Sequence, residues 1–202
     1  MATLTNQSKF RSSRQHGAVL IVALVMLAVL LLLGTSLASM AWINEKAARN
    51  DRDRIVAFQA AQSALTDAEL DIENSTHSNS RSQIFSPSSP EGFAVGCNAG
   101  NTNRHQGLCA QVVGQKPAWQ TVELAKIDEN SASVEFGRFT GKTMPHGEGP
   151  FSIYLPRYVI ELIPDNTAGQ TSARKFMYRI TAIGFGSDAE TQVVLQAVYR
   201  KI

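Results

Sequence analysis

Two cysteines and a histidine are the side chains of this sequence best placed for metal or redox chemistry. Cys97 and Cys109 are its only cysteines, and His105 lies between them. A structural zinc site needs a fourth ligand and a characteristic spacing, which this set lacks. The N-terminal region indicates export, and an isolated cysteine pair in an exported chain most simply forms one disulfide. We therefore expect a Cys97–Cys109 disulfide that stabilises the fold by about 3 kcal/mol, and no bound metal.

The histidines do not indicate a catalytic site. The four of them, His16, His77, His105 and His146, are scattered through polar or glycine-rich segments. No nucleophile elbow, phosphate-binding loop or paired-carboxylate motif recurs near them. His146 and Glu148 form the one close pair of a histidine and a carboxylate in a predicted loop. We expect neither enzymatic activity nor a cofactor.

An uncharged apolar run over residues 18–43 dominates the N-terminal region. The hydrocarbon core of a bilayer is about 30 Å thick and needs about 20 helical residues, so this run is long enough to span it. Lys9, Arg11 and Arg14 precede the run. The positive-inside rule therefore places the N-terminus in the cytoplasm and exports the residues that follow the run.

A removable secretory signal is an alternative explanation of this run. Such signals usually have an apolar stretch of only about 7–15 residues, followed by a cleavage site with small residues. Residues 38–41, Ala-Ser-Met-Ala, come closest to such a cleavage site, but Trp42 and Ile43 follow them without a cleavage pattern. Length and flanking sequence favour a segment that stays in the mature protein.

Helical periodicity continues beyond the apolar run. Apolar residues recur at alternating spacings of three and four, at Ile55, Phe58, Ala61, Leu65, Ala68 and Ile72. This spacing places them on one face of a helix, which we expect to pack on a sheet. We predict one helix from about Ala18 to about Glu73, amphipathic over residues 44–74. Gly34 is the expected position of any bend.

The C-terminal region alternates in the way that strands do. Residues 174–184 and 191–200 predict an antiparallel hairpin around the Gly-rich turn at 184–188. Tyr158, Ile160 and Leu162 predict an earlier strand, and residues 131–139 a fainter one.

A polar segment separates the predicted helix from these strands. Residues 75–114 are rich in Ser, Asn, Gly and Pro, which predicts a long loop with limited structure of its own. The expected fold class is therefore α+β: a long N-terminal helix covers one face of an antiparallel sheet of about four strands.

The composition is that of an ordinary folded chain with one membrane segment. Its 202 residues are 44% hydrophobic, and the formal net charge is +2. Acidic residues alternate with basic ones, as in residues 49–54, so there is no basic stripe that could follow a phosphate backbone. We expect no nucleic-acid partner.

Several segments carry a resemblance to a known family. They are Gly-Ala-Val-Leu-Ile-Val-Ala-Leu at 17–24, Glu-Lys-Ala at 45–47, Asp-Arg-Asp-Arg at 51–54, Ala-Phe-Gln-Ala-Ala-Gln-Ser-Ala-Leu at 57–65, Tyr-Arg-Ile-Thr-Ala-Ile-Gly-Phe-Gly at 178–186 and Gln-Val-Val-Leu-Gln at 192–196. With its basic leader ending in glycine before an apolar helix, the chain resembles a type IV pilin and, more narrowly, a minor pilin of the PilX type. This resemblance implies the type IV pilin fold.

The resemblance also implies how the N-terminus is processed. A prepilin peptidase removes the leader, residues 1–17, by cutting after Gly17, and it methylates the new amine of Ala18. The apolar helix is retained. It first anchors the protein in the bacterial inner membrane, with residues 75–202 as a periplasmic head, and later packs against other subunits in the pilus fibre.

The chain departs from the family pattern at two positions. Pilins usually begin with an aromatic residue after the cleavage site, where this chain has Ala18. Most carry a glutamate at the fifth mature position, where this chain has Val22. In the family that glutamate is thought to neutralise the terminal amine of a subunit already in the fibre, because an unpaired buried charge is costly. A subunit without it suits the fibre tip.

The expected function is that of a minor pilin in a tip or priming complex that initiates the fibre and counters its retraction. The partners implied by the resemblance are other minor pilins, the major pilin, a tip-associated adhesin and the prepilin peptidase. Two alternatives remain open. One is a membrane-anchored periplasmic binding or sensor domain, and the other is a pseudopilin of a type II secretion system.

Overall fold

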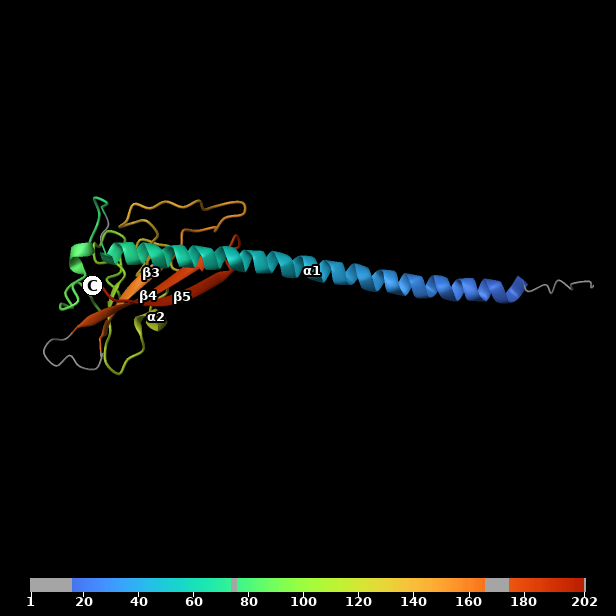
Figure 1. Ribbon diagram of the computed structural model, residues 1–202, viewed down its shortest axis with the longest axis horizontal. Coiled ribbons are helices and arrows are strands. Elements are labelled where there is room, and N and C mark those ends of the chain that lie inside the picture. Colours follow the sequence, from blue (N-terminus) through green and yellow to red (C-terminus); the bar gives the residue numbers. More distant parts are fainter. Residues whose placement is uncertain (1–15, 74–75, 166–174, 202) are drawn as a thin grey trace, which may run out of the picture. The chain divides into compact units, whose positions relative to one another are not determined.

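The computed structural model describes residues 16–73, 76–165 and 175–201 of the chain (Figure 1). The predicted leader lies outside the described residues except for His16 and Gly17. The chain divides into two compact units, Met1–Ala48 and Arg49–Ile202. From here on we call the second unit, which includes α1 from Arg49 onward, the head.

The order of elements agrees with the predicted α+β class. The elements are α1 (His16–Glu73), the 3-10 helix η1 (Ser82–Ile84), β1 (Leu108–Ala110), α2 (Ala118–Thr121), β2 (Val134–Glu135), β3 (Arg157–Pro164), β4 (Phe176–Phe185) and β5 (Gln192–Tyr199). The predicted single helix is confirmed, and α1 continues through Gly34 without a break. Alanine and leucine are the commonest residues of α1, and both have high helix propensity.

The head contains one five-stranded sheet with the order β1-β3-β4-β5, and β2 also pairs with β3. β3, β4 and β5 are antiparallel neighbours, and the predicted hairpin is the β4–β5 pair. The sheet is mixed rather than wholly antiparallel, because β1 runs parallel to β3. β1 can run parallel to β3 because a long connection separates the two strands. A tight turn between them would force antiparallel pairing.

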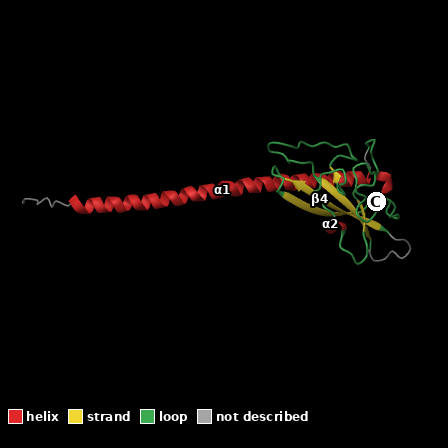
Figure 2. Ribbon diagram, turned by 180° about the vertical axis from the view of Figure 1, so that it is seen from behind, coloured by secondary structure: helices red, strands yellow, loops and turns green. Residues whose placement is uncertain are grey.

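The two faces of the sheet have separate hydrophobic cores. Figures 1 and 2 show the head part of α1 on one side of β3, β4 and β5, and α2 on the other. The α1 side contains Tyr158, Ile160, Tyr178 and Ile180, which pack with Ile72 of α1. The opposite side packs residues of the long loop and α2 against the sheet, among them Cys97, Cys109, Ala118, Val159, Ile183 and Phe185. Each face of the sheet therefore carries a hydrophobic core, whereas the sequence predicted packing on one face only.

The predicted loop over residues 75–114 is more ordered than its composition indicated. Its described residues include η1 and the short strand β1. A disulfide between Cys97 and Cys109 closes part of it, with an S–S distance of 2.05 Å, and both cysteines are buried. Local hydrogen bonds and this crosslink supply the order that hydrophobic periodicity did not predict.

Candidate functional site

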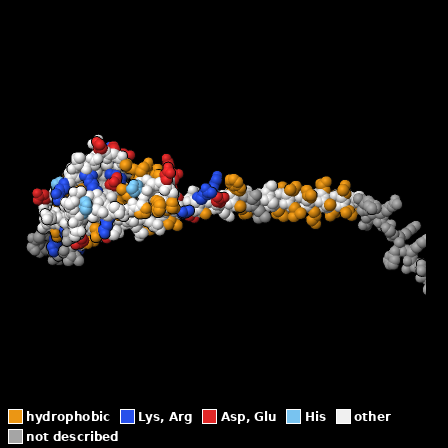
Figure 3. Space-filling model, turned by 90° about the horizontal axis from the view of Figure 1, so that it is seen from above, with side chains coloured by type: hydrophobic (Ala, Val, Ile, Leu, Met, Phe, Trp, Pro, Cys, Tyr) orange, Lys and Arg blue, Asp and Glu red, His pale blue; other side chains and the backbone are white. Residues whose placement is uncertain are grey.

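The N-terminal part of α1 presents apolar side chains on all sides. The large ones between Val19 and Leu33 are 48–72% exposed within the chain. Figure 3 shows these hydrophobic side chains along the helix. A continuous apolar surface of this kind needs lipid or another protein against it. By length and composition, α1 could cross a membrane.

The polar side chains that follow in α1 are satisfied by the helix itself. Thr35 Oγ1 and Ser36 Oγ each donate to the carbonyl of Leu32 at 3.0 Å, and Ser39 Oγ donates to Ser36 O at 2.8 Å. Backbone and hydroxyl groups that are bonded within one helix can enter lipid at low cost. These residues therefore do not interrupt the segment that could span a membrane.

The predicted processing site lies at the start of this helix. Gly17 and Ala18 belong to the first turn of α1 and are exposed, and Val22 one turn later is 57% exposed. The side chain at position 22 is therefore accessible to whatever surrounds the helix. Cleavage after Gly17 and methylation of Ala18 stay predictions.

In the head, α1 packs on the sheet through alanines. Ala57, Ala60, Ala61, Ala64 and Ala68 are all 0–1% exposed. A Cβ built on Gly184 of β4 would lie 3.0 Å from the Ala60 carbonyl carbon, and closer still to Ala57 O and Ala61 N. The backbones of helix and strand therefore meet almost directly, and only small side chains fit between them.

The predicted packing stripe is partly wrong for this reason. Ala61, Ala68 and Ile72 are fully buried, and Leu65 packs partly buried against the same core. Ile55 and Phe58, however, are 56% and 43% exposed. The predicted stripe included the large side chains of Ile55 and Phe58. Because helix and strand approach closely at Gly184, alanines face the sheet there instead, and Ile55 and Phe58 point outward.

A carboxylate of α1 also holds the turn between β4 and β5. Asp53 Oδ1 accepts hydrogen bonds from the Ser187 amide and hydroxyl, both at 2.5 Å, and from the Asp188 amide at 3.3 Å. Burial alone would raise the pKa of Asp53, but the hydrogen bonds from Ser187, Thr191 and Asp188 outweigh it and lower the pKa below 3.8. The ionised carboxylate thus fixes the hairpin to the helix.

A buried ion pair lies further along the same helix. Arg81 and Asp71 are both fully buried, with 2.7 Å between Nη2 and Oδ2 and a second contact from Nε. Tyr158 of β3 donates its hydroxyl to Asp71 at 3.0 Å, and burial raises the pKa of this tyrosine well above 10. The Arg81 guanidinium carbon also lies 3.7 Å from the centre of the Phe139 ring. Helix, loop and sheet therefore meet at one charged cluster.

Asp67 extends this cluster toward the segment that follows β2. It accepts hydrogen bonds from the Gly137 amide at 2.8 Å and from the Thr140 hydroxyl. Burial raises the pKa of Asp67 above 3.8, and the nearby Asp71 raises it further, although the two hydrogen bonds oppose both effects. Sequence reasoning missed both aspartates, because a polar residue on a helix is ordinarily assigned to the solvent side.

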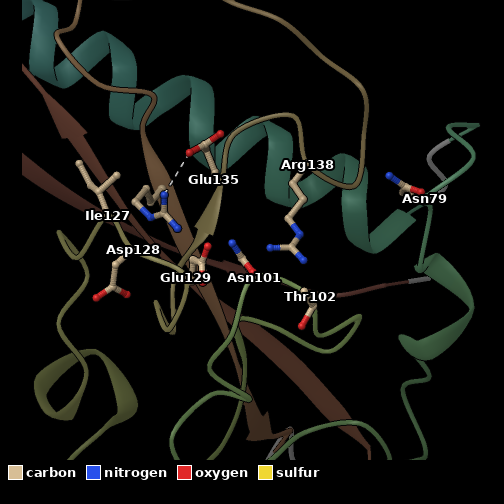
Figure 4. Close-up of a pocket in the computed structure, with 9 residues that line it drawn as sticks. Asn79, Asn101, Thr102, Ile127, Asp128, Glu129, Glu135 and Arg138 are labelled. Carbon is tan, nitrogen blue, oxygen red and sulfur yellow. Dashed lines mark hydrogen bonds and ion pairs between the residues drawn. The ribbon is translucent and has the colours of Figure 1, made fainter.

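An open hollow of about 750 Å³ lies on the head (Figure 4). It is lined by Asn79, Asn101, Thr102, Ile127, Asp128, Glu129, Glu135, Arg138 and Arg157. Much of its charge is neutralised locally, because Arg157 pairs with Glu135 at 3.3 Å and Asp128 with Lys126 at 3.1 Å. These lining residues include no hydrogen-bonded pair of nucleophile and base, so the hollow does not have the arrangement of a hydrolytic site.

The residues considered for metal chemistry are not brought together. Within the described ranges, no group of three His, Cys, Asp or Glu side chains could hold a metal ion. Cys97 and Cys109 bond to each other, and His146 Nδ1 lies 3.4 Å from the Met144 carbonyl oxygen of its own loop.

An apolar N-terminal helix that continues into a head and packs there on a mixed sheet defines a pilin-like α+β protein. Residues 16–66 match the family model described as PilX N-terminal, and residues 97–201 match the one described as type IV pilus assembly protein PilX C-term. The chain belongs to the PilX family of type IV pilus assembly proteins. This confirms the resemblance found in the sequence. Comparison with curated proteins and with solved structures gave no match.

The family is a structural component of the pilus and not a known family of enzymes. The protein therefore takes part in type IV pilus assembly and associates with other components of the pilus system.

Proposed function

We propose that this protein is a minor pilin of a tip or priming complex, which initiates the fibre and counters its retraction. The observation that carries the proposal is Val22, an exposed apolar residue at the position where most pilins carry a glutamate. A carboxylate there is thought to pair with the terminal amine of a subunit above. A subunit without it loses nothing at the tip, where no subunit lies above.

The apolar part of α1 supports the assembly role on physical grounds. Its side chains are exposed within the chain, so they are stable only in lipid or against other helices. A helix that leaves the inner membrane for a bundle of pilin helices exchanges one apolar environment for another. Because water never contacts this surface, the head can stay folded throughout the transfer.

The location and partners follow from the same proposal. The protein waits in the inner membrane with its N-terminus in the cytoplasm and its head in the periplasm, after a prepilin peptidase has cut between Gly17 and Ala18. It then joins other minor pilins, the major pilin and a tip-associated adhesin in the fibre. A sheared-pilus preparation should contain it in small amounts.

Mass spectrometry of the mature N-terminus and of sheared pili tests this proposal. We expect a chain that begins at N-methylated Ala18 and is present in the fibres. A chain that keeps residues 1–17 and stays in the membrane fraction would instead support an anchored binding or sensor domain. A processed chain that is absent from surface fibres would support a secretion pseudopilin.

The tip position is tested by the variant Val22→Glu. We expect it to move the protein away from the tip and to lower the number of fibres, because the new carboxylate can pair with the amine of another subunit. Val25→Glu is the matched control, since Val25 is similarly exposed at 54% and lies one turn later. If Val22→Glu and Val25→Glu behave alike, or if neither changes fibre number or location, the tip assignment is wrong.

A further inference from the structure

The two edges of the sheet differ in their hydrogen-bond pairing. At the β1 edge, Ala94 continues the hydrogen-bond ladder: its amide donates to Leu108 O at 3.3 Å, and its carbonyl accepts from Ala110 N at 2.9 Å. The disulfide at Cys109 holds this cover in place. At the other edge, none of the described residues hydrogen-bonds to the outer side of β5. The described residues therefore cover the β1 edge and leave the β5 edge without a hydrogen-bonded neighbour.

The open edge has none of the usual protection against strand pairing. Soluble proteins protect edge strands with charges, prolines, bulges or short length. β5 reads Gln-Val-Val-Leu-Gln-Ala-Val-Tyr from Gln192 to Tyr199, with no charged residue, proline or glycine. It pairs with β4 over its whole length without a bulge, from Phe185↔Gln192 to Tyr178↔Tyr199. None of its residues is fully buried.

Near the N-terminal end of β5, the head part of α1 also carries two exposed apolar side chains, Ile55 and Phe58. Tyr199 donates its hydroxyl to Glu73 Oε1 at 2.5 Å, so the Glu73 face of α1 is directed toward β5. Ile55 precedes Glu73 by five full helical turns and therefore lies on the same face. Phe58 is close to that face, and the Gly184↔Val193 pair places the N-terminal end of β5 beside this part of α1. Ile55 and Phe58 were predicted to pack on the sheet, but they instead lie beside the open edge.

The other face of β5 continues the same surface. Val194 and Val198 are 48% and 60% exposed there, on the side of the sheet away from α1. A strand added beside β5 would therefore meet Val194 and Val198 on one face and, at the N-terminal end of β5, Phe58 on the other. This distinguishes the edge from the outer face of an ordinary antiparallel sheet, where one side is polar.

We propose that the β5 edge binds an extended, uncharged segment of another pilus subunit, which joins the sheet as an additional strand. Only an extended backbone can satisfy the row of N–H and C=O groups on this edge. The segment is about as long as β5, and its alternate side chains cover Phe58 on one face and Val194 with Val198 on the other. A charged side chain packed on Val194 or Val198 would lose hydration there, which favours an uncharged segment. This inference rests on the proposed assembly function.

Photocrosslinking in the full-length protein, in cells that make pili, tests the proposal. The probe is p-benzoylphenylalanine, placed at Val194 or at Val198. We expect each probe to crosslink to one segment of another pilus subunit, and the crosslinked site to shift by about four residues between the two probes, because two paired strands advance together. Val113 is the control position, since it is 99% exposed in a loop. We expect no crosslink to that segment from Val113.

A charge at the edge gives a second, independent measurement. We expect Val198→Lys to reduce the crosslink from position 194 and the amount of protein in sheared pili by about tenfold, because edge lysines oppose strand addition. Val113→Lys should leave both unchanged. Thermal unfolding of the Val198→Lys protein should match the unmodified chain, since the substituted side chain is exposed.

Three outcomes would overturn the proposal. They are crosslinks to a second copy of this chain, crosslinked sites that do not move with the probe, and crosslinks no more frequent than those from Val113. Failure of the assembly function would look different. In that case the unmodified protein itself would be missing from sheared pili and would keep its leader.

Discussion

Gly184 of β4 lies against the backbone of Ala61 in α1, so closely that a side chain on the glycine would overlap the alanine amide nitrogen. This contact sets the distance between helix and sheet in the head. It also explains why the buried residues of α1 beside Gly184 are alanines, namely Ala57, Ala60 and Ala61. Gly184 adopts an ordinary extended conformation within a strand, so the need for glycine arises from space and not from backbone torsion.

Gly184→Ala should therefore destabilise the head. The added methyl group overlaps backbone atoms of α1 that cannot rotate away, and overpacking of this kind costs about 3 kcal/mol. We expect the midpoint of thermal unfolding, followed by near-UV circular dichroism in detergent micelles, to fall by roughly 6–12 °C. Val194→Ala, an exposed site on the neighbouring strand, should change stability by about 0.5 kcal/mol or less. Equal stability of the Gly184→Ala and unmodified proteins would contradict the close approach.

The buried pair Asp71–Arg81 should be the most sensitive ionic contact of the head. Arg81→Ala leaves the carboxylate of Asp71 buried without its cation, and we expect a loss of about 3–5 kcal/mol in unfolding free energy. Lys126→Ala is the matched control, because the Lys126–Asp128 pair is 39% and 47% exposed. Its loss should stay below about 1 kcal/mol. Similar losses for both variants in denaturant titrations would contradict this distinction.

Asp53 should contribute stability that acid removes. The pKa of Asp53 is lower in the folded head than its unfolded value of 3.8. The ionised carboxylate therefore stabilises the fold above pH 3.8, and this stabilisation is lost as the pH falls through the lowered pKa. Asp53→Asn should therefore be less stable than the unmodified protein at pH 7. The difference should disappear as the pH falls below 3.8, which unfolding curves at several pH values would show. A difference that is constant with pH would contradict the role of the charge.

Asp67 should have the opposite dependence. Burial raises its pKa in the folded head, so the folded state binds a proton more readily than the unfolded chain. Stability from this group therefore increases as the pH falls through the raised pKa toward 3.8, and the desolvation cost is fully present above it. Asp67→Asn should be more stable than the unmodified protein, and the difference in unfolding free energy should be larger at pH 7 than at pH 4. Urea titrations at these two pH values measure the gain, and an unchanged difference would contradict it.

The disulfide should stabilise the cover on the β1 edge. Replacing both Cys97 and Cys109 with serine removes a crosslink between residues 12 apart, and we expect a loss of about 3 kcal/mol. Hydrogen exchange at the Ala110 amide, which donates to Ala94, should accelerate more than exchange at β4 amides. Uniform acceleration across the sheet would show that the crosslink stabilises the whole head and not this edge.

Hydrophobic patterning predicted most of the secondary structure. Period-two alternation found β3, β4 and β5, because each strand places residues such as Tyr158 and Ile180 on a face that must be buried. It did not find β1, since three residues are too few to show a period. Only pairing to Ile160 of β3, distant in the sequence, makes Leu108 part of a strand.

Side-chain packing was less predictable than the elements themselves. The alanines of α1 were interpreted as helix formers, and nothing in their own sequence shows that Gly184 approaches them. Asp71 and Arg81 are buried through mutual neutralisation, which depends on where the chain returns after α1. Recognition of the family, by contrast, was possible from local segments at 17–24 and 57–65, because these segments are contiguous in the sequence.

The alanine face of α1 has a consequence for how the family can diverge. At positions 57, 61 and 184 any larger residue separates helix from sheet, so relatives should keep these positions small whatever they bind. Ile55 and Phe58 carry no such restriction, since they point outward. A lineage could therefore exchange its binding partners by changing a few outward residues on one helix, without altering the framework that supports them.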